Sequence, residues 1–205
     1  MSLFNLVTAT KSQLMAPGAP FEITNKQING QSYQVYCNAP LNLAQVINDA
    51  RRTDEQSFLV YQGEHCSYKQ FFQHVDNVAS YLQQHGIKQG DRVAIAMRNR
   101  PEWVIAFCAI ALIGAVPAPL NSFGMQQELI TALNGITPKL LICDGPRWQR
   151  ISQSNEWLTD TLVLNDTALD LSQSAAAIDF TKALNYSAHS IEPPTITATD
   201  AALVL

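Results

Sequence analysis

The stretch from Gly90 to Asp144 decides the fold, and it reads GDRVAIAMRNRPEWVIAFCAIALIGAVPAPLNSFGMQQELITALNGITPKLLICD. Within it, short apolar runs at residues 92–97, 115–120 and 139–143 alternate with helical patterns. Strands separated by helix-length connections cannot pair as hairpins, so they lie parallel with right-handed crossovers. Parallel strands are covered on both faces and are therefore apolar throughout. The sequence predicts an α/β fold, with a parallel βαβ sheet layered with helices.

The first helix of this unit has well-marked ends. Asn99 is predicted to cap it, Glu102 follows three residues later as in a capping box, and Pro101 occupies the first turn. Gly114 follows the last turn, where glycine commonly ends a helix. Residues 103–113 are all apolar. We therefore expect a helix that is buried on every side.

The uncharged run at residues 103–120 also raises the alternative of a membrane-spanning helix. Gly114, Pro117 and Pro119 interrupt such a helix well short of the width of a bilayer, and the βα alternation continues beyond them. We therefore expect no transmembrane span. The first residues lack a charged segment followed by a long apolar run, so no signal peptide is predicted.

Composition narrows the choice of partners and compartment. Charged residues make up only 15% of the chain, against about a quarter in ordinary domains, so we expect a partner or further chain to cover part of the surface. The net charge is −4 and there is no basic stripe, which argues against nucleic-acid binding. Cys37, Cys66, Cys108 and Cys143 show no CxxC spacing and are predicted to be reduced thiols of a cytoplasmic protein.

The remaining pattern divides the chain into three predicted segments. Residues 1–40 are a flexible lead-in and a small β ribbon turning at Asn29-Gly30, residues 41–165 form the α/β core, and residues 166–205 are a surface connection. Ser67 and Gln70 form a capping box at the start of an amphipathic helix. The predicted helices are 41–52, 67–85, 144–155 and one near 178–184; the predicted strands are 21–23, 31–36, 57–61, 65–66, 161–164 and 201–205.

No residue is assigned a catalytic, cofactor-binding or metal-binding role. Dinucleotide, P-loop, nucleophile-elbow and HExxH signatures are all absent from the sequence. The histidines have no neighbouring serine or cysteine in a recognisable nucleophile setting and no set of metal ligands, so they are interpreted as surface residues. They are His65, His74, His85 and His189.

One positional argument concerns the ends of the predicted strands, because ligands of an open parallel sheet gather outside its carboxyl edge. There Arg98 or Arg100 could meet a phosphate, and Asp144 a ribose hydroxyl. The alternative is that the caps and arginines serve the fold alone, and we prefer it because cap residues at these offsets need no ligand. The strand ends carry Arg98, Asn99, Arg100, Asn121, Ser122 and Asp144.

Several of these stretches together resemble a known family. Residues 90–95, 99–103 and 113–121 are similar to the N-terminal part of the AMP-forming adenylating enzymes, the superfamily of acyl-CoA synthetases, luciferases and peptide-synthetase adenylation domains. Residues 67–71 resemble that family's Thr-Tyr-x-Glu-Leu helix start, and residues 139–144 its next strand. The Pro-Leu-Asn ending of the second strand favours the acyl-CoA or fatty-acid ligase branch. The resemblance covers residues 41–144 and implies part of a large N-terminal domain.

The resemblance implies a two-step reaction in a longer parent protein. A carboxylate, expected to be a fatty acyl group, attacks the α-phosphate of ATP with Mg²⁺ balancing charge, and the thiol of coenzyme A then displaces AMP. Residues 200–205 resemble the strand that leads into the family's phosphate loop, so its catalytic elements would lie beyond Leu205. We therefore expect no cofactor in this chain itself and no activity from it alone.

Two other functions stay open at this point. The chain could be a stand-alone binding or regulatory module derived from the same fold, or part of a ligase that delivers its acyl group to a carrier protein. An unfinished sheet also leaves an open edge, so we expect the isolated chain to self-associate there.

Overall fold

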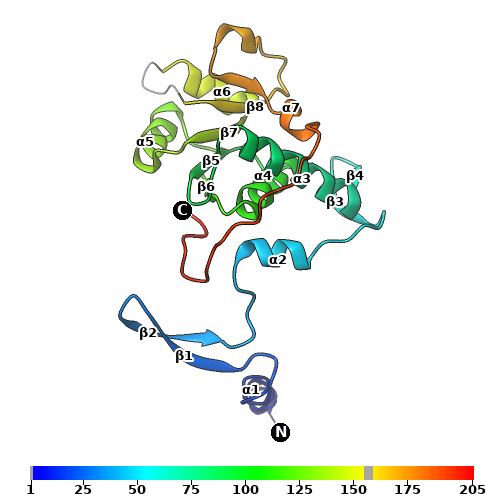
Figure 1. Cartoon of the computed structure of the whole chain (residues 1–205), viewed down its shortest axis with the longest axis vertical. Coiled ribbons are helices and arrows are strands. Elements are labelled where there is room, and N and C mark those ends of the chain that lie inside the picture. The colour runs from blue at the N-terminus through cyan, green and yellow to red at the C-terminus, as the bar shows by residue number, and fades with distance from the viewer. Residues whose placement is uncertain (1, 155–158) are drawn as a thin grey trace. The chain divides into compact units, whose positions relative to one another are not determined.

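The structure, a computed structural model, describes residues 2–154 and 159–205. The chain divides into two compact units, Met1–Leu41 and Asn42–Leu205, which are called unit 1 and unit 2 below (Figure 1). The α/β fold predicted from the sequence is confirmed, and it lies in unit 2. Each unit is described separately.

Unit 1 consists of the helix α1 (Leu3–Leu14) and a hairpin of β1 (Ile23–Ile28) and β2 (Gln31–Tyr36). The predicted ribbon is confirmed, because Asn29 and Gly30 take φ values of 51° and 80°, as a tight hairpin turn requires. The sequence predicted a flexible or loosely docked lead-in and no helix there, whereas residues 3–14 are helical. The sequence signal for the helix α1 is weak because α1 contains no buried residue. Ser2 caps this helix by accepting a hydrogen bond from the amide of Asn5 at 3.3 Å.

Unit 2 is built on a parallel five-stranded sheet with strand order β6-β5-β7-β8-β9. The predicted parallel pairing is confirmed, since β5 pairs in parallel with both β6 and β7. The sheet continues beyond residue 165, because β9 pairs with β8. The strands are β5 (Arg92–Ala96), β6 (Val116–Pro119), β7 (Leu140–Asp144), β8 (Thr161–Leu164) and β9 (Ala177–Asp179).

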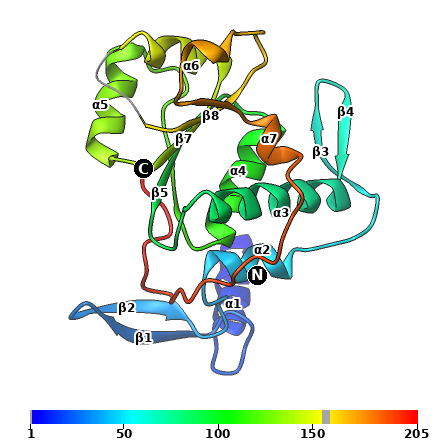
Figure 2. The same ribbon diagram turned by 45° about the horizontal axis from the view of Figure 1, so that its top comes forward.

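Helices cover both faces of this sheet (Figure 2). Successive strand residues alternate between two buried clusters: Val93 and Ile95 of β5 join the larger one, Ala94 and Ala96 the smaller. The larger cluster includes α2 (Leu43–Asp49), α3 (Tyr68–Gln84), α4 (Pro101–Leu112) and α7 (Thr181–Leu184); the smaller includes α5 (Gln126–Ile136) and α6 (Gly145–Ser152). A sheet buried on both faces explains why its strands lack the polar alternation of a half-exposed sheet.

The predicted hairpin and the predicted capping box both occur. The hairpin is formed by β3 (Ser57–Tyr61) and β4 (Glu64–Ser67), which leads directly into α3. The Ser67 hydroxyl accepts from the amide of Gln70 at 3.2 Å, and the Gln70 side chain accepts from the amide of Ser67 at 3.0 Å. A 3₁₀ turn at Leu171–Gln173 lies before β9.

The predicted start of α4 is wrong by one residue. Arg100 is the N-cap, with φ −157° and ψ 164°, and no side chain caps the helix. The reason is that Pro101 forms the first helical position, and a residue before proline is driven into the extended region. Asn99 is therefore too early to cap, and Glu102 pairs with Arg100 instead of closing a capping box.

The expectation that α4 is buried on every side is also wrong. Trp103, Val104, Phe107 and Cys108 are only half-buried, and the rings of Trp103 and Phe107 stack with centroids 5.4 Å apart. The sheet, α2 and α3 cover the other sides of the helix. None of the described helices combines the length and the apolarity that a bilayer crossing requires.

The ends of two predicted helices need correction. Residues 177–179 form β9 rather than the start of a helix, and α7 begins only at Thr181. The helix predicted to reach Asn155 is α6, which ends at Ser152; Asn155 lies outside the described residues.

The strand predicted at residues 201–205 is not formed, although this segment touches the free edge of β6 through one hydrogen bond, from Val204 N to Pro117 O at 3.1 Å. The amide of Val116 donates to the carbonyl of Asp91, directly before β5, and that of Leu120 to the carbonyl of Ile95, so positions 117 and 119 face the free edge. Both are proline and have no N–H to donate. The edge therefore offers acceptors but cannot build a full ladder.

Candidate functional site

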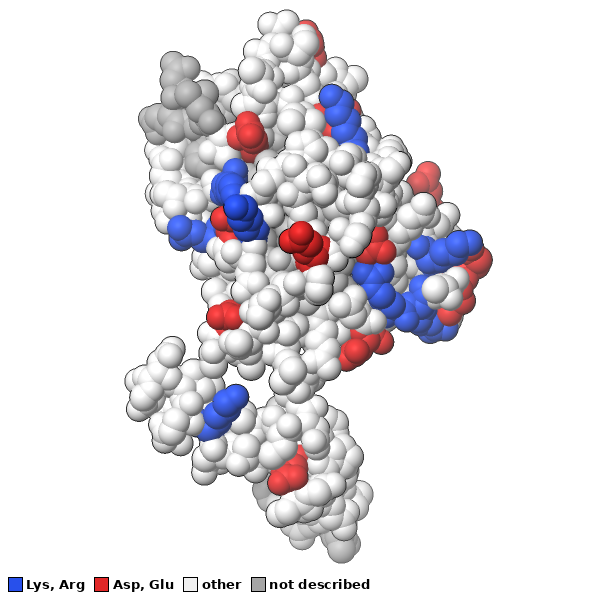
Figure 3. Space-filling model, in the orientation of Figure 1, with Lys and Arg blue, Asp and Glu red and all other residues white. Residues whose placement is uncertain are grey.

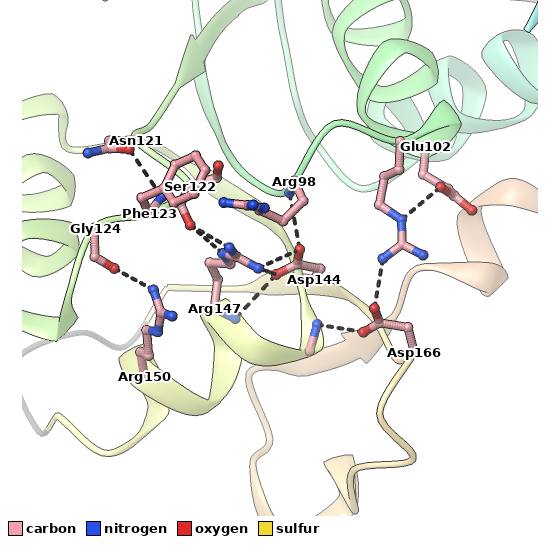
Figure 4. A network of polar contacts seen from close by, with 12 residues as sticks. Arg98, Glu102, Asn121, Ser122, Phe123, Gly124, Asp144, Arg147, Arg150 and Asp166 are labelled. Atoms are coloured by element: carbon pink, nitrogen blue, oxygen red, sulfur yellow. Dashed lines mark hydrogen bonds and ion pairs between the residues drawn. The ribbon is translucent and has the colours of Figure 1, made fainter. Parts of the chain in front are cut away.

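The candidate site is the carboxyl edge of the parallel sheet, where the segments after β5, β6, β7 and β8 come together (Figure 4). Polar side chains from these segments form two networks of hydrogen bonds and ion pairs. The first is centred on Asp144 at the end of β7, and the second on Arg100 at the start of α4. Whether this edge can accept a ligand depends on whether the polar side chains of these networks are already bonded to other protein groups.

Asp144 is almost completely buried and satisfied by protein groups. Its carboxylate accepts from the amide of Arg147 at 3.2 Å, which caps α6, and from the amide of Arg98 at 3.1 Å, which ties the end of β5 to β7. It also pairs with the Arg147 guanidinium at 3.0 Å. Asp144 and Arg147 are only 1% and 6% exposed, so neither is open to a ribose hydroxyl.

The two arginines of α6 hold the loop after β6 by its backbone. Arg147 Nε donates to the carbonyl of Ser122 at 2.7 Å, and Arg150 Nη1 donates to the carbonyl of Gly124 at 2.6 Å. Asn121 Oδ1 accepts from the amide of Phe123 at 3.1 Å. The loop is thus fixed through its main chain, while the Phe123 side chain stays 70% exposed.

Arg100 joins α4 to the segment after β8. It pairs with Glu102 at 3.1 Å and with Asp166 at 2.7 Å. Asp166 also accepts from the amide of Gly145 at 3.2 Å, so its carboxylate bridges the starts of α4 and α6. Both acids are committed to the guanidinium, which leaves Arg100 engaged within the fold.

Arg98 differs from its neighbours because its side chain is exposed. Its guanidinium carbon lies 3.6 Å from the centre of the Phe123 ring, a cation–π contact. An exposed guanidinium on a ring face keeps its N–H donors available to an anion. Of the groups predicted for phosphate or ribose, Arg98 is therefore the one whose chemistry still suits a ligand.

The structure favours the structural interpretation for most of the predicted positions. Asp144, Arg100, Asn121 and Ser122 make contacts within the protein, and Asn99 is exposed beside them. Arg147, Arg150 and Asp166 were not predicted from the sequence. Arg147 carried a usable signal: an arginine in the first turn of a helix opposes the helix dipole and needs a nearby carboxylate, here three residues earlier.

The histidines and cysteines do not supply a second site. Among the described residues no group of three or more His, Cys, Asp or Glu is arranged to hold a metal ion. His65 Nδ1 lies 2.9 Å from Ser57 Oγ, a contact not predicted from the sequence, and both side chains are exposed on the β3–β4 hairpin. Burial raises the pKa of Cys108 to about 11 and that of Cys143 well above its ordinary value, so both thiols stay protonated.

Charged groups on the outer surface are mixed in sign. Acidic and basic residues lie side by side on the face drawn in Figure 3. Near the start of α3, Arg51 pairs with Asp76 at 2.6 Å and Lys69 pairs with Glu55 at 2.8 Å. Such neutralised pairs do not form a single-sign patch for a highly charged ligand.

Unit 2 is thus a parallel α/β unit in which most of the predicted carboxyl-edge residues bond to other groups of the protein, while Arg98 stays exposed. The family described as AMP-binding enzyme matches residues 47–205. The chain belongs to this family. The resemblance to the adenylating enzymes stated from the sequence is therefore confirmed.

The similar proteins include several CoA ligases. A crotonobetaine/carnitine–CoA ligase of Escherichia coli (strain SE11) is 26% identical over 134 residues, covering 64% of this chain and 26% of the relative. An anthranilate CoA ligase solved with anthranoyl-AMP has a TM-score of 0.70 at 17% identity, covering 81% of this chain and 32% of that one. A benzoate CoA ligase from Burkholderia xenovorans LB400 has a TM-score of 0.68 at 17% identity, covering 80% and 32%. The chain spans about a quarter of the length of the curated relative, and the solved structures support the fold alone.

Proposed function

We propose that this chain is the N-terminal part of an AMP-forming acid–thiol ligase, a protein that activates a carboxylic acid and transfers it to coenzyme A. The observation that carries the proposal is the family match over residues 47–205, together with a CoA ligase relative of which only 26% is covered. In the proposed reaction a carboxylate oxygen attacks the α-phosphorus of ATP and pyrophosphate leaves. The thiolate of coenzyme A then attacks the acyl carbon, and AMP leaves.

The role proposed for this portion is to build and stiffen one layer of the ligase. Its carboxyl-edge acids and arginines are engaged with one another, as in the Asp144–Arg147 and Arg100–Asp166 pairs. Neither pair is free to stabilise charge that develops on a phosphate or an acyl carbon. We therefore propose that the chain alone is inactive, and that ATP, Mg²⁺ and coenzyme A are used by the longer parent protein.

The carboxylic acid substrate is proposed to be a fatty acyl group, on the strength of the Pro-Leu-Asn ending at residues 119–121. The substrates named for the relatives, a betaine and two aromatic acids, belong to those proteins. The cytoplasmic location likewise stays a prediction. A set of straight-chain fatty acids beside benzoate, anthranilate and crotonobetaine would rank the substrate classes directly.

The test is carboxylate-dependent exchange between ATP and labelled pyrophosphate. The 205-residue chain is expected to give none with any acid of that set, whereas a longer product of the same reading frame is expected to give exchange with at least one acid. Exchange by the short chain would contradict its inactivity. A stop codon directly after Leu205, with no exchange, would instead support the stand-alone binding or regulatory module.

The thiol acceptor is tested separately, once exchange has been found. Coenzyme A and a phosphopantetheinyl carrier protein are offered to the longer protein in turn, and thioester formation is followed by mass spectrometry. We expect the acyl group to appear on coenzyme A. Transfer to the carrier protein alone would support the ligase that delivers to a carrier and would overturn the choice of acceptor.

A further inference from the structure

Residues 185–197, which we call the strap, run from α7 along α3 without forming a helix or a strand, as the orange-to-red chain in Figure 2 shows. In the described part of the chain, residues 187–196 make no backbone-to-backbone hydrogen bond. A segment of this length that crosses a folded surface must satisfy its backbone groups in another way. Here side chains of α3 and of the α3–β5 turn do so.

Two glutamines each hold one strap residue by both of its backbone groups. Gln83 Nε2 donates to the carbonyl of Glu192 at 3.0 Å, and Gln83 Oε1 accepts from the amide of Glu192 at 3.0 Å. Gln89 Nε2 donates to the carbonyl of Thr195 at 3.2 Å, and its Oε1 accepts from the amide of Thr195 at 2.9 Å. Each side-chain amide thus supplies one donor and one acceptor to the strap backbone, as a residue of a neighbouring strand would.

Further contacts secure the strap at both sides of these glutamines. The buried Ser80 hydroxyl accepts from the amide of His189 at 2.9 Å, and the ring of Tyr186 meets Tyr81 edge to face at 5.4 Å. Toward the other end, Asn42 Nδ2 donates to the carbonyl of Ile196 at 3.2 Å. The strap therefore contacts α2 and α3, and its Tyr186, Ile191 and Ile196 side chains are half-buried against the larger hydrophobic cluster.

Gly114 contacts the C-terminal part of the strap. A Cβ atom at this position would lie 2.6 Å from Pro194 Cβ and 3.2 Å from Ile196 Cγ2, and the φ of Gly114 is +74°. No other residue type leaves room for Pro194 without a shift of the strap. Gly114 therefore both ends α4 and allows the close approach of Pro194.

We propose that the strap opens as a local unit while the sheet and α3 stay folded, and that its hydrogen bonds to Gln83 and Gln89 hold it closed. The exposed hydrogen bonds contribute little each, and the apolar side chains that the strap packs on the core are only half-buried, so the strap is expected to open well before the core does. Opening would also release residues 198–205, because Val204 is held at the edge of β6 by a single hydrogen bond to Pro117.

The test is amide hydrogen exchange followed by NMR in the Gln83→Ala/Gln89→Ala double variant. The informative amide is that of His189, because its own acceptor, Ser80, is unchanged. We expect it to exchange at least about tenfold faster than in the wild type, while the amides of α3 and β5 keep their rates. Gln84→Ala, an exposed glutamine on the same helix with no hydrogen bond to the strap among the described residues, is the matched control and should change nothing.

A second variant tests strap opening while both glutamines stay in the sequence, although the added Cβ would also lie 3.2 Å from Gln89 Cγ. Gly114→Ala pushes on Pro194 and should accelerate exchange at His189, Glu192 and Thr195, whereas Gly86→Ala, also at positive φ but with nothing within 4 Å, should not. Unchanged exchange at His189 in both the double variant and Gly114→Ala would overturn the proposal. So would an equal acceleration of the α3 and β5 amides, because the strap would then open only with the whole unit.

Discussion

At the residue scale, Asp144 joins three parts of the fold through one carboxylate. It caps α6, fixes the end of β5 and neutralises Arg147. A buried ion pair is costly to desolvate, and breaking it leaves a charge with no partner. The importance of Asp144 therefore lies in what its loss would do to Arg147.

Asp144→Ala is expected to lower the free energy of unfolding by about 3–5 kcal/mol, because the buried guanidinium loses its carboxylate and α6 loses its cap. Urea denaturation followed by tryptophan fluorescence measures the loss. Glu55→Ala, which breaks the exposed pair with Lys69, is the control and should have a much smaller effect. Equal losses in the two variants would contradict this account of Asp144.

At the element scale, the starts of β5 and β7 are joined by a charge pair whose effect depends on pH. Burial alone would raise the pKa of Asp91, but hydrogen bonds from Lys139 Nζ and the amide of Lys88, with the charges of both lysines, outweigh it and lower the pKa below its ordinary 3.8. Lys139 also donates to the carbonyl of Gly86 at 2.6 Å. The pair thus links the turn before β5 to the neighbouring strand.

The pH dependence follows from the sign of this shift. Because the folded-state pKa of Asp91 is depressed, the ionised carboxylate stabilises the fold above pH 3.8, and this contribution is lost as the pH falls through the lower folded-state pKa. The difference in Tm between wild type and Asp91→Asn should be steady near neutral pH and shrink in acid. Asp49→Asn, whose carboxylate forms no ion pair among the described residues, is the control. A Tm difference between wild type and Asp91→Asn that grew as the pH fell would contradict the lowered pKa of Asp91.

The free edge of β6 explains how this strand resists pairing. Its outward positions are Pro117 and Pro119, so a neighbouring chain finds no N–H donors there. The self-association expected from the sequence stays a prediction, and this edge works against it.

Pro117→Ala/Pro119→Ala restores the two donors and should increase self-association, measured by light scattering over a range of concentrations. Pro17→Ala, an exposed proline in unit 1, is the control. An unchanged mass for the double variant would show that the missing donors do not keep this edge from pairing.

At the scale of the whole molecule, the buried core belongs entirely to unit 2. Both hydrophobic clusters draw their buried residues from the range Ala44 to Ala183, whereas α1 has none. Unit 1 also carries many of the exposed large apolar side chains, among them Leu3, Phe4 and Val7. The two units therefore differ in how much of their own stability they can supply.

Removal of residues 2–41 is expected to leave the urea midpoint of unit 2 close to that of the full chain, since no core residue is lost. Circular dichroism and fluorescence of the shortened chain measure this. A non-cooperative or much earlier transition would mean that unit 1 stabilises unit 2.

Local patterns in the sequence were enough for the central elements. The apolar runs predicted β5, β6 and β7, and Ser67 with Gln70 predicted the start of α3, because each signal depends on residues within a few positions of one another. The failures have equally physical causes. Asn99 does not cap α4, because Pro101 places the preceding Arg100 in the extended conformation of the N-cap. Residues 201–205 form no strand, because the proline positions at the edge of β6 offer no N–H donors.

The candidate site was predictable in position but not in its contacts. Parallel strands bring their carboxyl ends to one edge whatever the side chains are, so the sequence by itself determined the fold and the place to search. Only the tertiary structure decided that Arg100 meets Asp166, that Arg147 is buried on Asp144, and that Gln83 holds Glu192. Except for the close Asp144–Arg147 pair, these partners are far apart in the chain, and their meeting depends on how the helices and the strap pack on the sheet, which no local pattern encodes.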